Sequence, residues 1–296
     1  MIKYIIAFVF LSLASCNSKK AEEREIKEKS FELYKATNQK GVLILFPGFG
    51  GGGSENTKNE FKILDIAAKN SISVVLMDFD HHVFLKKTEK EALKIELEQL
   101  FEKYKIGYEN ICIGGFSAGG NISLLLSDFL ITSKSKVVPK SVFIVDSPID
   151  LLKIYQVSEK NISINHNEES VEESKWIIEN FNLDFGNPSK GIQNYELNSP
   201  FTNQTLNLTN VSALKKTKIR FYTEPDIEWW KEHNGYSYRD LNAFSIFEMA
   251  EEMKKQQFSN VEVIKTKNKG YRANGNRHPH SWSIVDADNL MNWMLN

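Results

Sequence analysis

A serine lies in a short glycine-rich segment between an apolar run and a helical pattern. The segment is Gly115-Phe116-Ser117-Ala118-Gly119; NICIG precedes it and ISLLLSDFL lies beyond it. A strand-turn-helix of this kind exposes a serine hydroxyl in a strained turn, where only small neighbours fit. At the head of the predicted helix, the backbone N–H of Ala118 and the helix dipole face the same point. We therefore interpret Ser117 as a nucleophile and Ala118 as a donor to a developing oxyanion.

Two other interpretations of this turn are a phosphate-binding loop and a glycine-rich turn that only permits close packing. The sequence lacks the lysine of a P-loop, and no acidic residue stands at the distance that a dinucleotide fingerprint requires. These differences disfavour a phosphate-binding loop. A packing turn remains the alternative.

A serine hydroxyl is a weak nucleophile until a base accepts its proton. Two histidines, His278 and His280, lie between the last predicted strand and the last predicted helix, in the segment RHPHSWS. Both follow Ser117 in the chain, as the histidine does when the order is serine, acid, histidine. The segment therefore supplies two candidates for the general base.

The base in turn needs a carboxylate that fixes its tautomer and stabilises the imidazolium. The predicted strand KIRFYT is followed by Glu224-Pro225-Asp226, which lies between the serine and the histidines in the sequence. Asp226 and Glu224 are the first candidates. Asp146, at the end of the preceding predicted strand, is a third.

A second oxyanion donor is expected from the glycine-rich segment that follows the first central strand. This segment reads VLILFPGFGGGGSEN, and the N–H of Phe49 or of Gly50 could join that of Ala118. The alternative is a flexible glycine hinge without a catalytic part.

Apolar runs alternate with helical patterns along the rest of the chain, which is typical of a parallel sheet with helices on both faces. One region, about 150–210, breaks this rhythm; it holds one helical stretch near 171–181 and is otherwise loop-like, as a lid over the site would be. The predicted strands end at residues 46, 77, 115, 146, 223 and 265, and the predicted helices cover 59–70, 88–104, 118–131, 241–257 and 283–295.

Taken together, the segments around Pro47, Ser117, Asp226 and His280 resemble the α/β-hydrolase superfamily over residues 41–296. The resemblance implies a doubly covered, mostly parallel sheet. It also implies acyl transfer by Ser117, His280 and Asp226, with no metal or organic cofactor, and it favours Asp226 over Glu224 and His280 over His278. Pro47 departs from the family, which more often has histidine there, and FELYKA is the single strand candidate before residue 41.

The substrate expected from this resemblance is a small or oligomeric carboxylic ester. A serine peptidase of the same fold shares all of these residues, and so does a non-catalytic relative that binds a ligand in the same pocket.

The first residues have the layout of a secretory signal peptide over 1–15. Leu13-Ala14-Ser15-Cys16 looks like a bacterial lipobox, which implies cleavage before Cys16 and diacylglycerol on its sulfur. Residues 16–40 are then a charged tether, and 41–296 a hydrolase domain anchored to a membrane of the cell envelope. The alternative is an ordinary signal peptide or a short membrane anchor in which Cys16 is incidental.

The overall composition fits one large α/β domain. The chain has 296 residues, of which 41% are hydrophobic and 25% charged, and its formal net charge is -1. A balanced charge disfavours nucleic acid as a partner. The sequence does not indicate an oligomeric state.

Overall fold

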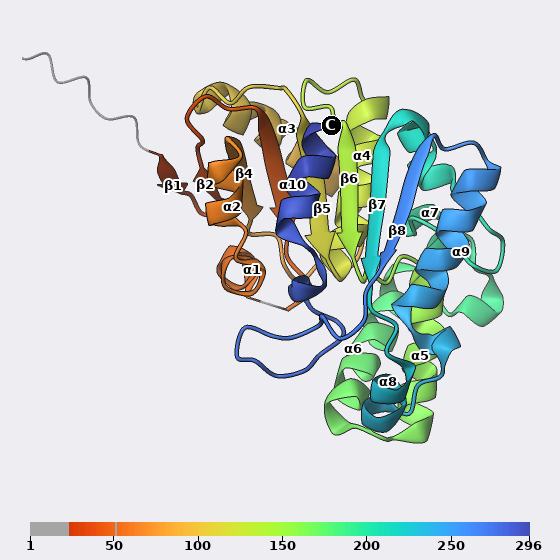
Figure 1. Ribbon diagram of the computed structural model, residues 1–296. Helices are drawn as coiled ribbons and strands as arrows, with labels where there is room; N and C mark the ends of the chain where they lie inside the picture. The colour runs from red at the N-terminus through yellow and green to blue at the C-terminus, as the bar shows by residue number, and fades with distance from the viewer. Residues whose placement is uncertain (1–23, 51) are drawn as a thin grey trace, which may run out of the picture.

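A computed structural model describes residues 24–50 and 52–296, so the predicted signal peptide and Cys16 lie outside the described residues. The described strands form one sheet in the order β1-β2-β4-β3-β5-β6-β7-β8 (Figure 1). β1 pairs with β2 and β2 pairs with β4 in antiparallel orientation. All the other neighbouring strands, from β4 across the sheet to β8, pair in parallel. The strands are β1 (Glu25–Lys27), β2 (Phe31–Tyr34), β3 (Gly41–Phe46), β4 (Ile72–Met77), β5 (Ile111–Phe116), β6 (Ser141–Val145), β7 (Lys218–Thr223) and β8 (Asn260–Lys265).

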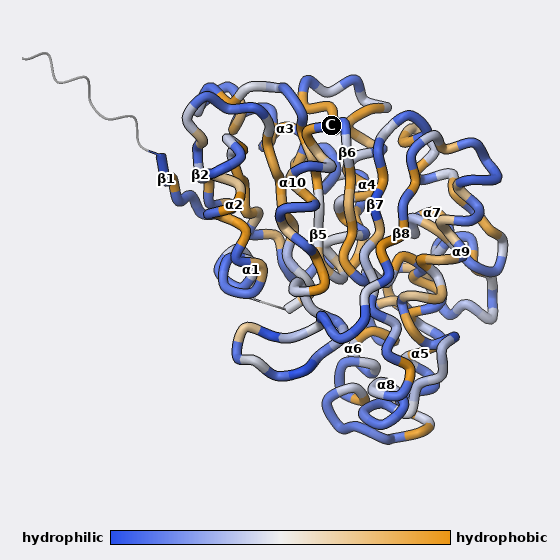
Figure 2. The backbone as a smooth tube through the Cα atoms, viewed as in Figure 1, coloured by the Kyte–Doolittle hydropathy of each residue, from blue (hydrophilic) through white to orange (hydrophobic). Residues whose placement is uncertain are grey.

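The central strands are apolar because helices cover both of their faces. Every residue of β3, β4, β5 and β6 is buried, and Figure 2 shows hydrophobic residues along the middle of the sheet. The predicted class, a mostly parallel α/β sheet with helices on both faces, is confirmed. The strand expected within FELYKA is β2. β1 was not expected, and it completes eight strands.

Neighbouring residues of β3 show how the two helical layers are arranged. The α-helices outside the segment between β6 and β7 are α1 (Gly53–Phe61), α2 (Leu64–Lys69), α3 (Lys87–Lys103), α4 (Ala118–Thr132), α8 (Ile227–Asn234), α9 (Asn242–Lys255) and α10 (Ala287–Leu295). Ile44 packs in a core with α3 and α4, whereas Leu43 and Leu45 pack in a second core with α2 and α10. α9 covers β6 and β7 in a third cluster.

Two predicted helices are shorter than expected. The pattern over 59–70 contains two helices, α1 and α2, because Lys62 between them has a φ of 52°, which ends α1. The last helix begins at Ala287, where the side chain of Asp286 accepts a hydrogen bond from the N–H of Asn289 and caps it.

Between β6 and β7 the chain forms a helical cap beyond the carboxyl ends of the strands (Figure 1). Its helices are α5 (Leu151–Ile164), α6 (Glu168–Asp184) and α7 (Gln193–Asn198). The prediction of mainly loop structure was wrong for α5 and α7. The cap has a hydrophobic cluster of its own, formed by Leu151, Leu152, Tyr155, Phe181, Phe185 and Tyr195. This cluster explains why helices form where the sequence periodicity is weak.

Across residues 24–50 and 52–296, no helix is both long enough and apolar enough to cross a bilayer.

Glu32 of β2 binds Lys58 in the last turn of α1, the helix that follows the glycine-rich segment after β3. This carboxylate is 2% exposed and accepts bonds from Tyr34 Oη at 2.6 Å and Lys58 Nζ at 3.2 Å. Lys27 pairs with it at 2.8 Å. Burial acts to raise the pKa of Glu32, but the hydrogen bonds from Lys27, Tyr34 and Lys58 outweigh it and lower the pKa to about 2.

This lowered pKa predicts a stability loss in acid. A carboxylate with a depressed pKa stabilises the fold above its unfolded pKa, and this contribution is lost as the pH falls through the folded pKa. Between pH 5 and pH 2, wild type should lose up to about 3 kcal/mol of unfolding free energy through Glu32 alone. Urea denaturation of Glu32→Gln should show a correspondingly weaker pH dependence. Glu179→Gln, at an exposed site, is the control; equal slopes for Glu32→Gln and wild type would contradict the prediction.

Candidate active site

Ser117 occupies a strained backbone position between β5 and α4. Its φ is 53° and its ψ is -126°, a conformation that non-glycine residues adopt only when the surrounding structure imposes it. The N–H of Ser117 donates to the carbonyl of Val145 at 2.9 Å, which holds the turn against β6. A strained serine at the carboxyl end of a central strand, at the head of a helix, is the arrangement that the sequence predicted.

The glycines around Ser117 are required by close backbone contacts. A Cβ on Gly115 would lie 2.2 Å from the carbonyl carbon of Gly119, and a Cβ on Gly119 would lie 2.3 Å from the carbonyl oxygen of Pro47. Neither position can hold a side chain without moving backbone. The turn is therefore compressed between β5, the start of α4 and the loop after β3.

Ser117 and His280 line the same cleft, which has a volume of about 680 Å³. It lies between the carboxyl ends of the strands and the helices α5, α6 and α8. This is where ligands bind in open α/β sheets. Other residues that line it are Gly48, Phe49, Ala118, Glu173, Trp176, Trp229, Arg272 and His278.

The side chain of His280 is bonded to Asp146, at the end of β6. His280 Nδ1 lies 2.7 Å from Asp146 Oδ2, and the other carboxylate oxygen, Oδ1, accepts a bond from Thr223 Oγ1 at 2.6 Å. Asp146 is 5% exposed. A carboxylate on Nδ1 fixes the tautomer that leaves Nε2 free to accept a proton.

The backbone on both sides holds Asp146 in place. Its N–H donates to the carbonyl of Tyr222 at 2.8 Å, and its carbonyl accepts a bond from Asn242 Nδ2 at 2.8 Å. Its φ of 45° lies in the left-handed region, directly after the end of β6. Asp146 was the third candidate from the sequence, and in the structure it is the carboxylate that contacts the histidine.

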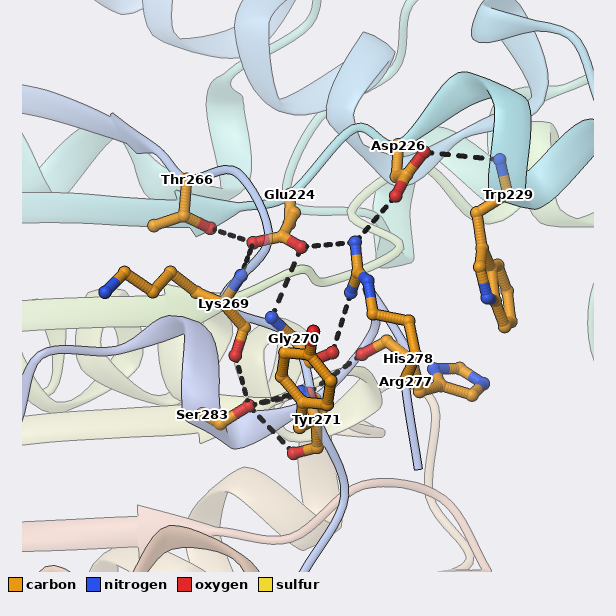
Figure 3. A network of polar contacts seen from close by, with 11 residues as sticks. Glu224, Asp226, Trp229, Thr266, Lys269, Gly270, Tyr271, Arg277, His278 and Ser283 are labelled. Carbon is orange, nitrogen blue, oxygen red and sulfur yellow. Dashed lines mark hydrogen bonds and ion pairs between the residues drawn. The ribbon is translucent and has the colours of Figure 1, made fainter. Parts of the chain in front are cut away.

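Asp226, the preferred acid from the sequence, is not brought to His280. Its Oδ2 accepts a bond from Arg277 Nη2 at 2.6 Å, and its Oδ1 accepts one from the N–H of Trp229 at 3.2 Å, which caps α8 (Figure 3). The physical reason is that α8 begins directly after Asp226 and uses this carboxylate at its own N-terminus. The geometry therefore replaces Asp226 with Asp146 as the partner of His280.

Glu224, the other acid candidate, is buried and holds the loop that leads to His280. One of its oxygens accepts bonds from Thr266 Oγ1 at 2.8 Å and from the N–H of Lys269 at 2.9 Å. The other accepts a bond from the N–H of Gly270 at 3.2 Å and lies 2.6 Å from Arg277 Nη2 (Figure 3). Its carboxylate therefore positions the loop and does not contact the histidine.

His278, the alternative base, lies against Trp229 and Trp230 at ring distances of 4.8 and 5.7 Å. Burial, reinforced by the charges of Arg272 and His280, lowers the pKa of His278 to about 3, so its ring is neutral at neutral pH. Within the described residues its Nδ1 is buried without a hydrogen-bond partner. Since no carboxylate orients its ring, the geometry favours His280 as the base.

The predicted oxyanion segment lies against the nucleophile turn. A Cβ on Gly48 would lie 3.4 Å from the Cβ of Ser117 and 3.0 Å from the ring of Phe116. The next residue, Phe49, places its ring 4.7 Å from that of Trp176 in α6. Ala118 is the first residue of α4, where a backbone N–H has no partner within the helix. The segment is thus adjacent to Ser117 and also contacts the cap.

Glu173 of α6 faces the cleft from the cap. It is accessible to solvent, but the surrounding walls partly desolvate its carboxyl, which raises the pKa of Glu173 against the opposing charge of His280. The cap therefore contributes an acidic group to the lining of the cleft. No local sequence pattern indicates this group, because its place in the cleft depends on the tertiary structure.

Comparisons with known proteins identify the fold of the chain but no family. No family model matches the sequence, and a search of curated proteins finds no match either.

Solved structures match nearly the whole chain at low identity. An esterase/lipase from an uncultured bacterium has a TM-score of 0.56 at 13% identity and covers 93% of this chain and 86% of its own. The fluorophosphonate-binding serine hydrolase F of Staphylococcus aureus has a TM-score of 0.55 at 11% identity, covering 92% and 96%. Carboxyl esterase 2 of the mycorrhizal fungus Tuber melanosporum has a TM-score of 0.55 at 16% identity, covering 90% and 80%. Together with the eight-stranded sheet, these likenesses show that the chain has the α/β-hydrolase fold.

Proposed function

We propose that this protein is a serine hydrolase of carboxylic esters, with Ser117 as nucleophile, His280 as general base and Asp146 as the orienting acid. The observation that carries the proposal is the 2.7 Å bond between His280 Nδ1 and Asp146 Oδ2, on a histidine that lines the same cleft as the strained serine. The esterase and serine hydrolase folds found among the solved structures support it.

In the proposed mechanism, the serine attacks, the histidine accepts its proton and the aspartate supports the histidine. Ser117 Oγ attacks the ester carbonyl carbon as its proton passes to His280 Nε2, and Asp146 stabilises the imidazolium that forms. The negative charge on the carbonyl oxygen is met by the N–H of Ala118 and by an N–H of Phe49 or Gly50. One such donor is typically worth about 10²- to 10³-fold in turnover.

The tetrahedral intermediate then releases the alcohol. The bond from the carbonyl carbon to the alkoxide oxygen breaks, and the leaving oxygen takes the proton from His280 Nε2. Water attacks the acyl enzyme in the same way, with His280 again accepting a proton, and the carboxylic acid leaves Ser117.

We also propose that the cap of α5 to α7 acts as a lid, and that Cys16 carries a lipid anchor. The cap lines the cleft over the site, and the ring of Trp176 contacts Phe49 of the oxyanion segment. The anchor rests on the lipobox-like sequence Leu13-Ala14-Ser15-Cys16 after an apolar run. It would hold the enzyme at the cell envelope, on a membrane surface.

Ser117→Ala tests the nucleophile. A fluorophosphonate should add one covalent adduct to wild type and none to the variant, because the phosphorus bonds to the serine oxygen. Ester hydrolysis should fall by about 10⁴-fold or more. Ser127→Ala, at a buried serine of α4, the helix that follows Ser117, is the control and should keep labelling and activity. A folded wild type that takes up no label, as judged by intact mass, would support a non-catalytic binding protein instead.

Asp146→Asn and Asp226→Asn separate the two acids. Asp146→Asn should lower kcat by about 10⁴-fold, because an amide cannot stabilise the imidazolium or hold the same tautomer. Asp226→Asn should stay within about tenfold of wild type, since Asn keeps a side-chain oxygen that can cap α8 and loses only the charge paired with Arg277. Steady-state kinetics on one activated ester measures both, with circular dichroism as the folding check. A large loss in Asp226→Asn with near-normal activity in Asp146→Asn would overturn the assignment.

Cys16→Ser tests the anchor. Wild type expressed with its first residues in a bacterial host should partition into the detergent phase, because the acyl chains of one diacylglycerol together bury enough apolar surface for stable binding. The variant should partition into the aqueous phase with unchanged specific activity. Equal partitioning of the two proteins would contradict lipidation of Cys16.

A further inference from the structure

Arg272 lines the cleft next to the proposed nucleophile. Its guanidinium carbon lies 5.7 Å from the ring centroid of Phe116, the residue before Ser117. The ring of His280 lies 4.4 Å from the same Phe116 ring. The guanidinium and the proposed base therefore share one aromatic neighbour at the site.

The backbone around Arg272 is held by three consecutive amides. The N–H of Tyr271 donates to Ser283 Oγ at 2.7 Å, and that of Arg272 donates to the carbonyl of Asn276 at 2.9 Å. The N–H of Ala273 donates to Glu60 Oε2 at 3.0 Å. A side chain on such a fixed backbone is presented to the cleft with less conformational entropy left to lose on binding.

The positive charge of Arg272 is not neutralised by the part of the chain that the structure describes. Over residues 24–50 and 52–296, its guanidinium makes no hydrogen bond or ion pair; Glu60 attracts it from beyond ion-pair distance. Partial burial lowers the pKa of Arg272, with Glu60 opposing. Partly burying a guanidinium without a counter-ion costs free energy, and a bound anion would offset that cost.

We propose that Arg272 binds a carboxylate of the substrate, so that the preferred esters carry a free carboxylate a few bonds from the scissile carbonyl. The planar guanidinium can donate two parallel bonds to a carboxylate. The short spacing is inferred because Arg272 and His280 both contact the ring of Phe116, the residue before Ser117. This assignment rests on the proposed hydrolase function and names the substrate class of that same site.

Two matched esters test the inference. The mono-4-nitrophenyl ester of glutaric acid carries a carboxylate, and 4-nitrophenyl valerate is a neutral ester of similar length with the same leaving group. Wild type should favour the anionic ester in kcat/KM. Arg272→Gln should lower kcat/KM for the anionic ester by about 10- to 100-fold and change that for the neutral ester by less than about threefold. Arg272→Lys should lie between, because it keeps the charge and loses the planar fork.

A control and an inhibition assay complete the experiment. Arg239→Gln removes an exposed arginine outside the cleft lining and should leave both rates unchanged. Glutarate should inhibit wild type competitively and Arg272→Gln at least tenfold more weakly. Inhibition by inorganic phosphate without inhibition by glutarate would overturn the choice of a carboxylate.

Failure of the carboxylate inference and failure of the hydrolase proposal give different results in these assays. Equal losses on both esters in Arg272→Gln would show that Arg272 only supports Phe116, and would overturn the inference. So would a wild type that hydrolyses the neutral ester without any preference for the anionic one, although the hydrolase assignment would then stand. A folded wild type that hydrolyses neither ester would overturn both.

Discussion

A single buried carboxylate, that of Glu224, holds the loop on which the cleft depends. Its two oxygens accept bonds from Thr266, Lys269 and Gly270 and pair with Arg277. The loop between β8 and the last helix is long, and ordering a long segment costs conformational entropy. Because Glu224 sits at the end of β7, it ties this loop to the rigid sheet. The proposed base, His280, and the cleft residue Arg272 both lie on the loop that this connection holds.

The sheet was largely predictable because its signals are local. Each apolar run that becomes a buried parallel strand is readable without knowledge of its neighbours, and the small residues around Ser117 reflect a turn that tolerates no side chains. The same holds for the loop before the last helix, which contains His280. These features depend on a few consecutive residues, so the sequence specifies them well.

The acid was less predictable because its identity depends on distances between strands. Asp146 and Asp226 each stand at or just beyond the end of a parallel strand, and their sequence contexts do not show which one reaches His280. In the structure, α8 begins immediately after Asp226 and uses its carboxylate as a cap, whereas Thr223 and Asn242 fix Asp146 beside the histidine. Of the cap helices, α5 and α7 were missed for a similar reason, since they are stabilised by packing against each other and against α6.

The contact between Phe49 and Trp176 joins the glycine-rich segment after β3 to the cap. Phe49 belongs to the segment beside Ser117, and Trp176 belongs to a cap helix, with ring centroids 4.7 Å apart. Any displacement of α6 must break or reshape that contact. This contact couples the cap to the backbone beside the proposed nucleophile, so a molecule that displaces α6 also disturbs the segment proposed to bind the oxyanion.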